Sequence, residues 1–495
     1  MQDLKHKTIR GGFARLVAQI INFIVRLGSL MILARLLDPA DFGLVGMVTA
    51  FTGVLNLFRD FGLSSAAVQR TNVTDEQFST LFWINVLVGL VLGIVAVIMA
   101  PAMVSFYHEP RLFRVTLVLA LGFLFNAAGV QHTALLQRQM RFTALAMINT
   151  IGLVAGTLVA IAGAKAGYGY WALVVMPVIY PLVTTVGLWI STGWIPGRPQ
   201  RRSGIRSMMR FGGIVTANGI TMYMASNFDK SLVGRYLGAD VLGIYGRAYQ
   251  LINIPSDNLN SVAGEVAFAA LSRVKDDPIS LRNYFLKGYS LVLAMTLPIT
   301  LACAFFAEDV IRVLLGPKWM TAAPIFRYLA PTILAFAVLN PLGWLLNSLG
   351  LVVRGLKIAL VLAPVMVAGY ALGLRYGAAG VAISYSATMI LSVLPLIAWA
   401  VHGTSISVRD IVKTIGQPLT SSFVGTVVAL LARFTIGKFL APLPLLVMES
   451  SILLIVFVLM LFYVMKQKTF YMNLIQGFRK QAPVEEQVLV SAAGS

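Results

Sequence analysis

Long stretches without a charged side chain recur along this sequence. Residues 78–107 and residues 166–197 contain no Asp, Glu, Lys or Arg. A helix crosses a hydrocarbon layer about 30 Å thick with about 20 apolar residues, so each stretch is long enough to span a membrane. Backbone groups inside lipid need partners within the protein, which leaves helices and closed barrels as spanning forms, and the alternating pattern of a barrel is not visible. The predicted fold class is an all-α integral membrane protein.

The overall charge content supports this interpretation. Charged residues make up 12% of the 495 residues, and the mean hydropathy is +0.82. A soluble protein has about 25% charged residues. The net charge of +20 is attributed to Lys and Arg that accumulate on cytoplasmic loops, so nucleic acid is not an expected partner. The basic start is interpreted as part of a retained first helix, and the single Cys303 excludes an intramolecular disulfide.

The apolar runs predict about fourteen membrane-spanning helices. The loops at alternate ends of these helices differ in charge, and the set rich in Lys and Arg is predicted to be cytoplasmic. The chain is therefore expected in a bacterial inner (cytoplasmic) membrane, multi-pass, with both termini cytoplasmic. The helices are expected near residues 12–37, 41–60, 78–103, 111–131, 143–165, 169–192, 208–236, 240–262, 284–306, 324–349, 356–374, 377–400, 414–436 and 443–465.

The sequence repeats itself at an offset of 200 residues. LARLLDPADFGLVG at 33–46 resembles VGRYLGADVLGIYG at 233–246, and the identities include Gly43 with Gly243. Six helices per repeat give both copies one orientation, which predicts two parallel lobes suited to alternating access. The expected domains are an N-lobe at 1–196, a basic cytoplasmic linker at 197–207, a C-lobe at 208–402, two extra helices at 403–465 and a cytoplasmic tail at 466–495.

Polar residues follow one face of the first predicted helix. Their spacing of three or four residues places them on the same side, and two of them are arginines. Two interpretations stay open: a structural ion pair between Arg26 and Asp60, or a cationic cavity wall that holds an anionic group such as a phosphate. The residues on this face are Arg15, Gln19, Asn22 and Arg26.

Further polar residues lie in the second, seventh and eighth predicted helices. Asn56, Arg247 and Gln250 are candidates to line the same substrate cavity. Tyr245 and Tyr249 could stack on sugar rings or pack within the bundle. Helices 3, 5, 6, 12 and 14 look nearly featureless and are expected to face lipid or to serve as scaffold. The candidates for ion coupling are Asp60, Asp229 and Glu265.

Motifs of catalysis and of metal binding are missing from the sequence. No P-loop, H-E-x-x-H or G-x-S-x-G pattern occurs, and the four histidines are scattered. The predicted loops leave no room for a catalytic domain outside the membrane. An enzyme, a cofactor and a metal site are therefore not expected, while proton or sodium coupling remains open.

Several blocks resemble the polysaccharide transport group of the multidrug/oligosaccharidyl-lipid/polysaccharide superfamily, and most closely its colanic-acid-type, Wzx-like exporters. They are ILARLLDPADFGLVGMV at 32–48, LFRDFGLSSAAVQR at 57–70, TLFWINVLVGLVLG at 80–93, ALLQRQMRF at 134–142, RAYQLINIPSDNLNSV at 247–262 and LLGPKW at 314–319.

The resemblance implies two six-helix lobes in a V, with the two extra helices forming a groove. It also implies a flippase for undecaprenyl-diphosphate-linked oligosaccharide repeat units, which serves exopolysaccharide or lipopolysaccharide biosynthesis. Membrane lipids and other polysaccharide-assembly proteins are the implied partners. Lipid II flippases of the same superfamily use a cavity arginine on the first helix, and Arg26 is the residue here that is similar in position.

Two other functions compete with this expectation. A cation-coupled multidrug exporter of the same superfamily should carry carboxylates as its main cavity charge; Arg15 and Arg26 favour an anionic cargo, whereas Asp60, Asp229 and Glu265 keep the drug exporter open. A membrane glycosyltransferase or polymerase should have a large external loop, and the predicted loops are too short for one.

Overall fold

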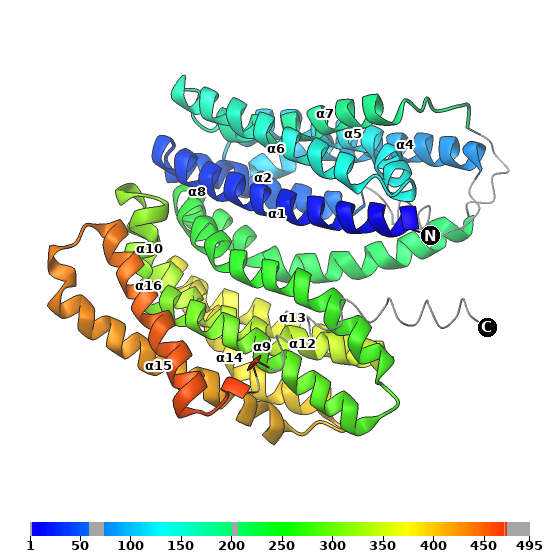
Figure 1. Ribbon diagram of the computed structural model, residues 1–495. Coiled ribbons are helices and arrows are strands. Elements are labelled where there is room, and N and C mark those ends of the chain that lie inside the picture. The colour runs from blue at the N-terminus through cyan, green and yellow to red at the C-terminus, as the bar shows by residue number, and fades with distance from the viewer. Residues whose placement is uncertain (1, 59–73, 200–205, 470, 473–495) are drawn as a thin grey trace, which may run out of the picture. The chain divides into compact units, whose positions relative to one another are not determined.

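The computed structural model describes residues 2–58, 74–199, 206–469 and 471–472, and it is helical in these ranges (Figure 1). This confirms the predicted all-α class. The helices are α1 (Gln2–Leu36), α2 (Pro39–Leu57), α4 (Asp75–Tyr107), α5 (Arg111–Arg138), α6 (Phe142–Lys165), α7 (Trp171–Thr192), α8 (Arg206–Arg273), α9 (Pro278–Phe305), α10 (Ala307–Leu314), α11 (Ala322–Leu329), α12 (Pro331–Ser348), α13 (Val352–Leu374), α14 (Gly377–Val401), α15 (Val408–Thr435) and α16 (Pro442–Leu459), with short turns η1 (Pro317–Trp319), η2 (Gly437–Phe439) and η3 (Met460–Val464).

Most of these helices have the length and the apolar composition of membrane spans. Twelve helices among the described residues are long and apolar enough to cross a membrane. The seventh and eighth predicted helices correspond to the two arms of α8, which are separated by a non-helical residue, Gly238, with φ 85° and ψ 178°. Glycine adopts such a positive φ without a steric penalty, so the chain can change direction there.

The structure differs from the predicted helices at three places. α1 begins at Gln2 and not near residue 12, because its polar first half continues the helix although only Gln19–Leu36 is apolar enough to span. The tenth predicted helix is divided into α11 and α12 at Pro331, which has no N–H to donate to the preceding turn. α10 was not expected, since its acidic start made the segment resemble a loop.

The chain divides into two compact units, which are described separately. Unit 1 comprises Met1–Gly246 and the segment Leu314–Trp319; unit 2 comprises Arg247–Val313 and Met320–Ser495. The lobe boundaries expected from the repeat remain a prediction.

Unit 1 is built around four packed helices, α4 to α7, with α1 lying along α6 (Figure 1). Small residues allow the close packing that membrane helices need. A Cβ atom on Gly89 of α4 would lie 2.4 Å from Cβ of Ala127 on α5. Large apolar side chains such as Ile98 and Ile190 are exposed, at 69% and 78%. Such a surface is stable only against lipid or a partner.

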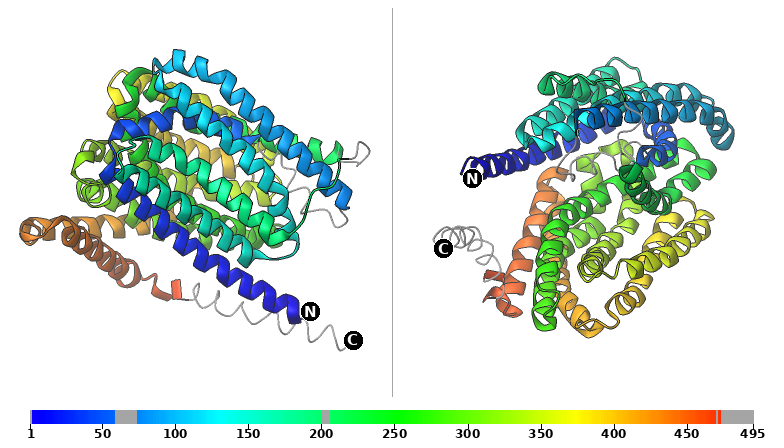
Figure 2. Two further views of the ribbon diagram at one scale, coloured as in Figure 1. Left: turned by 90° about the horizontal axis from the view of Figure 1, so that it is seen from above. Right: turned by 90° about the vertical axis from the view of Figure 1, so that its right-hand side faces the viewer.

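Unit 2 has its core between α9, α12, α14 and α15. Leu293, Leu345 and Ile397 are each fully buried in one apolar cluster there. The α15–α16 hairpin packs against α9 (Figure 2). Its two helices approach closely at Gly425, where a Cβ atom would lie 2.7 Å from the carbonyl oxygen of Leu453. The last two helices are therefore an integral part of this unit.

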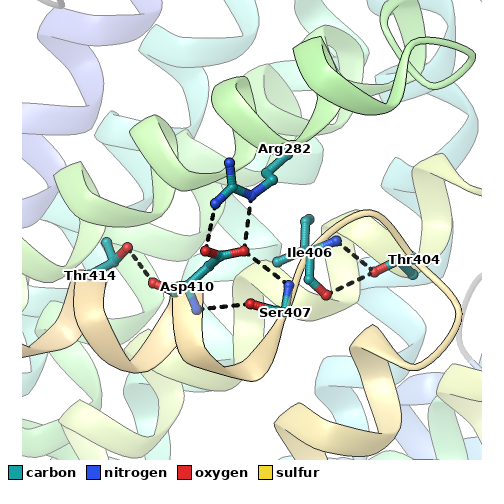
Figure 3. Close-up of polar contacts among 6 residues, drawn as sticks. All are labelled: Arg282, Thr404, Ile406, Ser407, Asp410 and Thr414. Carbon is teal, nitrogen blue, oxygen red and sulfur yellow. Dashed lines mark hydrogen bonds and ion pairs between the residues drawn. The ribbon is translucent and has the colours of Figure 1, made fainter.

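A bidentate ion pair fastens one end of α15 to α9 (Figure 3). The Arg282 guanidinium donates to both carboxylate oxygens of Asp410, with N–O distances of 2.6 and 2.9 Å. Asp410 is held in place by a capping box at the start of α15, in which its backbone N–H donates to the Ser407 side chain and its carboxylate accepts from the Ser407 N–H. Two parallel hydrogen bonds fix orientation as well as distance.

Replacing Arg282 with Gln should lower the thermal midpoint of the purified protein slightly, because Arg282 is partly exposed and solvent screens the pair. Asp410→Asn should lower the midpoint by a similar amount. The double variant should lose less than the two single variants added together, since both remove one interaction. Strict additivity in this cycle would show that the pair does not couple α9 to α15.

Candidate functional site

The polar face of α1 lies partly open in unit 1. Gln19 and Arg26 are exposed and Asn22 is half-buried. No carboxylate among the described residues lies within ion-pair distance of Arg26, whose backbone carbonyl accepts a hydrogen bond from Ser29 Oγ at 2.8 Å. Arg26 is thus a cation on an accessible part of a predominantly apolar helix.

The other residues predicted for the site lie on α1, α2 and α8 or outside the described residues. Asn56 is exposed on α2, and its Nδ2 donates to the carbonyl oxygen of Thr52 at 3.0 Å. Arg15 lies on α1 and Glu265 lies on α8. Asp60 lies outside the described residues, so the interpretation of Arg26 and Asp60 as an ion pair stays a prediction.

In unit 2, Arg247 and Gln250 contact each other. Nη1 of Arg247 donates to Oε1 of Gln250 one turn along α8. Arg247 is half-buried and Gln250 is exposed. The pairing orients the guanidinium along the helix.

The buried carboxylate Asp229 is bonded across the bend of α8. Its Oδ2 accepts a hydrogen bond of 2.7 Å from the Tyr245 hydroxyl, and both side chains are fully buried. The two residues lie on opposite sides of Gly238, so the bond ties the two arms of the helix together. Tyr249 is also buried and lies 6.2 Å from the ring of Tyr385. Bundle packing, and not sugar stacking, is therefore the role of both tyrosines.

The two copies of the repeat meet in unit 1 through their glycines. A Cβ atom on Gly43 would lie 1.7 Å from the carbonyl oxygen of Ala239, and one on Gly243 would lie 1.8 Å from that of Pro39. Each glycine thus touches the residue four positions before the other glycine. The contact is reciprocal, as in an isologous interface, and neither position has room for a side chain. We call this contact the glycine crossing.

A segment from the second half of the chain docks beside the glycine crossing. Trp319 is fully buried in unit 1, where its Nε1 donates to the carbonyl oxygen of Ala34 at 2.7 Å and its ring meets Phe42 edge to face at 5.3 Å. Lys318 forms an ion pair with Asp38 at 3.0 Å. We call residues 314–319 the docking segment. It joins the turn between α1 and α2, next to one side of the crossing.

Sequence reasoning missed a buried charge cluster in unit 2. Arg433 of α15 contacts Asp309 of α10 and Glu449 of α16 through the same nitrogen, Nη1. The prediction that the last helix is nearly featureless is wrong at Glu449, which is fully buried. The sequence could have indicated this cluster, because Glu449 is the only charged residue between 442 and 464, and a lone charge in a spanning helix needs a partner inside the protein.

Replacing Gly43 or Gly243 with Ala should destabilise the protein by about 1–3 kcal/mol, the usual cost of overpacking. The new Cβ would meet a backbone oxygen, which cannot rotate away. The matched control is Gly246→Ala, because nothing lies within 4 Å of a Cβ there. Alanine favours a helix by about 0.5–1 kcal/mol over glycine, so the control should be neutral or stabilising in the same unfolding measurement. Equal effects at Gly43 and Gly246 would contradict the crossing.

The comparisons with known proteins agree with one another. A family described as polysaccharide biosynthesis protein matches residues 32–324. The chain is 27% identical over 402 residues to the lipopolysaccharide biosynthesis protein WzxC of Escherichia coli (strain K12), covering 79% of this chain and 80% of that protein. It is 28% identical over 347 residues to the teichuronic acid biosynthesis protein TuaB of Bacillus subtilis (strain 168), covering 68% of each.

Solved structures of low sequence identity share the fold. The lipid II flippase MurJ, in an inward closed conformation, aligns with a TM-score of 0.73 at 14% identity, over 94% of this chain and all of MurJ. An inward-facing multidrug resistance MATE family transporter aligns with a TM-score of 0.62 at 15% identity, over 81% of this chain and 99% of that one. The predicted fold of fourteen helices is thereby confirmed.

Proposed function

The chain belongs to the polysaccharide biosynthesis family, and we propose that it moves a lipid-linked oligosaccharide repeat unit across the inner membrane. It is a multi-pass membrane protein of a transporter family and not an enzyme. Its relatives include a protein described as the succinoglycan biosynthesis transport protein ExoT of Rhizobium meliloti (strain 1021), 23% identical over 320 residues, or 65% of this chain and 64% of that one. The superfamily inferred from the sequence blocks is confirmed.

The observation that carries the proposal is the exposed Arg26 on the polar face of α1. The diphosphate of a lipid-linked oligosaccharide carries charge and its sugars carry many hydroxyls, so this headgroup cannot enter hydrocarbon without a replacement for its hydration. A guanidinium can replace two water contacts of a phosphate at once, with a charge that no cellular pH removes. Gln19 and Asn22 supply neutral hydrogen-bonding groups on the same face. We propose undecaprenyl diphosphate as the lipid carrier.

The glycine crossing supports alternating access as the mechanism. Two repeat copies that meet through a side-chain-free contact can separate there without removing an interdigitated core. The positive-inside rule, applied to the basic loops, supports a cytoplasmic location of both chain termini.

Arg26→Ala should abolish surface polysaccharide and accumulate cytoplasm-facing lipid-linked repeat units. Arg26→Lys should retain part of the activity, because it keeps the charge but loses the bidentate fork. The matched control is Arg111→Ala, since Arg111 is an exposed arginine already paired with Glu109 at 2.8 Å. Both variants must reach the membrane in wild-type amounts. Wild-type polysaccharide in the Arg26→Ala strain would remove Arg26 from the proposal.

A cation-coupled multidrug exporter is the second candidate, and the buried carboxylate Asp229 favours it. Coupling through Asp229 predicts that Asp229→Asn uncouples transport from the proton or sodium gradient. Transport of lipid-linked sugar in proteoliposomes should then stop responding to an imposed gradient while binding persists. Wild-type flux that ignores both gradients would reject coupling, and export of cationic drugs without lipid-linked sugar would favour the second candidate.

A further inference from the structure

Three charged side chains meet inside unit 2 at the end where α15 and α16 are joined. Arg433 lies in the last turn of α15, Glu449 lies two turns into α16, and Asp309 lies in the first turn of α10. Arg433 Nη1 donates to Asp309 Oδ2 and, at 3.0 Å, to Glu449 Oε1. We call Asp309 and Glu449 the carboxylate pair, and the pair together with Arg433 the cluster.

The carboxylate pair is buried more deeply than its arginine. Asp309 is 3% exposed and Glu449 is fully buried, while the Arg433 side chain is 30% exposed. With both carboxylates ionised, two negative charges share one positive charge, and the cluster carries a net charge of −1. An uncompensated charge away from water is costly, and two carboxylates at one site resist simultaneous ionisation.

One carboxylate oxygen is left without a partner. Glu449 Oε2 is buried and accepts no hydrogen bond from any described residue. Apolar side chains surround this region, where Phe306, Ala429 and Leu453 form a buried cluster. An ionised carboxylate would leave part of its charge on this unpartnered oxygen, whereas a protonated carboxyl group leaves only a neutral O–H there, which costs much less to bury. The geometry therefore fits a carboxylic acid better than a carboxylate.

We propose that Asp309 and Glu449 together hold one exchangeable proton. The proton brings the cluster to electrical neutrality, with one carboxylate paired to Arg433 and the other carboxyl neutral. It belongs to the pair and not to one residue, because the two acids share the same nitrogen of Arg433 as their partner. This site is separate from the coupling residues expected from the sequence, and it does not depend on the identity of the cargo.

A proton suits the pair better than a metal cation. Sodium, magnesium or calcium would require several oxygen ligands around one point. No group of three or more acidic, histidine or cysteine side chains that could hold a metal occurs among the described residues. Arg433 also places a positive charge against both carboxylates, which repels a second cation but leaves room for a proton on the far oxygen.

Few other titratable groups adjoin the carboxylate pair within the described chain. α10 also carries Glu308 and Arg312, and Glu308 pairs with Arg327 at 3.0 Å where both are exposed. α9 ends near the pair with Cys303, a half-buried thiol. The electrostatic partners of Glu449 are Arg433 and Asp309. A titration of this region therefore reports mainly on the pair.

The test is the pH dependence of unfolding of the full-length protein in detergent. A proton that is held when folded and released when unfolded makes stability fall as pH rises, by ~tenfold in the unfolding equilibrium constant per pH unit. This slope should appear in the wild type between about pH 5 and about pH 8. Glu449→Gln and Asp309→Asn should each remove it, because one carboxylate and Arg433 are already neutral together.

The matched control is Glu308→Gln, one residue from Asp309 on the same helix. This variant removes an exposed carboxylate that is paired with a different arginine, Arg327. It should leave the pH dependence of stability as it is in the wild type. An identical slope in the wild type and in both pair variants would overturn the proposal. Loss of the slope in Glu308→Gln as well would overturn it too, because the proton would then not belong to the pair.

Infrared spectroscopy gives a readout that does not depend on whether the pair variants fold. The wild type should show the carbonyl stretch of a buried protonated carboxylic acid at neutral pH, and the signal should disappear as the pH rises. Folded Glu449→Gln protein should lack it at every pH. A wild-type spectrum without any such signal means that the cluster is a fixed ionic triad and that no proton is held there.

Discussion

Polar groups that enter a hydrocarbon layer have to find their partners inside the protein, because lipid supplies none. Helices meet this demand for the backbone. Side chains meet it through specific pairs: Asp229 accepts from Tyr245 across the bend of α8, and Arg433 is shared between Asp309 and Glu449. Arg26 differs from these, since it is exposed on a spanning helix and no described carboxylate neutralises it. The proposed role of Arg26 in binding an anionic cargo rests on that difference.

The same demand shapes the attachment of the last two helices to unit 2. Arg282 and Asp410 join α9 and α15 at one end, and Arg433 joins α15 to α16 and α10 at the other. The first pair is partly exposed, so it can break and reform in water. The second is buried, so a change in its charge must be balanced within the protein. The hairpin is therefore held at one end by a solvent-screened ion pair and at the other by a buried cluster that is sensitive to its charge.

The apolar runs were sufficient to predict the spanning helices, because the bilayer requires a similar apolar length of each. The repeat paired Gly43 with Gly243 in sequence, but it did not predict that each would contact the other's chain, because a sequence offset contains no information about distance. Tertiary contacts decided what was missed. Trp319 resembles a loop residue in sequence, yet it is fully buried, and Glu449 was overlooked because the residues around it are uniformly apolar. Helical spacing placed Gln19, Asn22 and Arg26 on one face of α1, and their role in a cavity stays a prediction.

The docking segment means that the halves of the duplicated sequence are not self-sufficient pieces. Unit 1 includes residues 314–319 and the first arm of α8, although both follow residues 197–207, the linker expected from the sequence. A fragment ending at residue 207 would lack Trp319, and Ala34 and Phe42 would lose their contacts with it. During synthesis on the ribosome, unit 1 therefore cannot complete its fold until residue 319 has emerged.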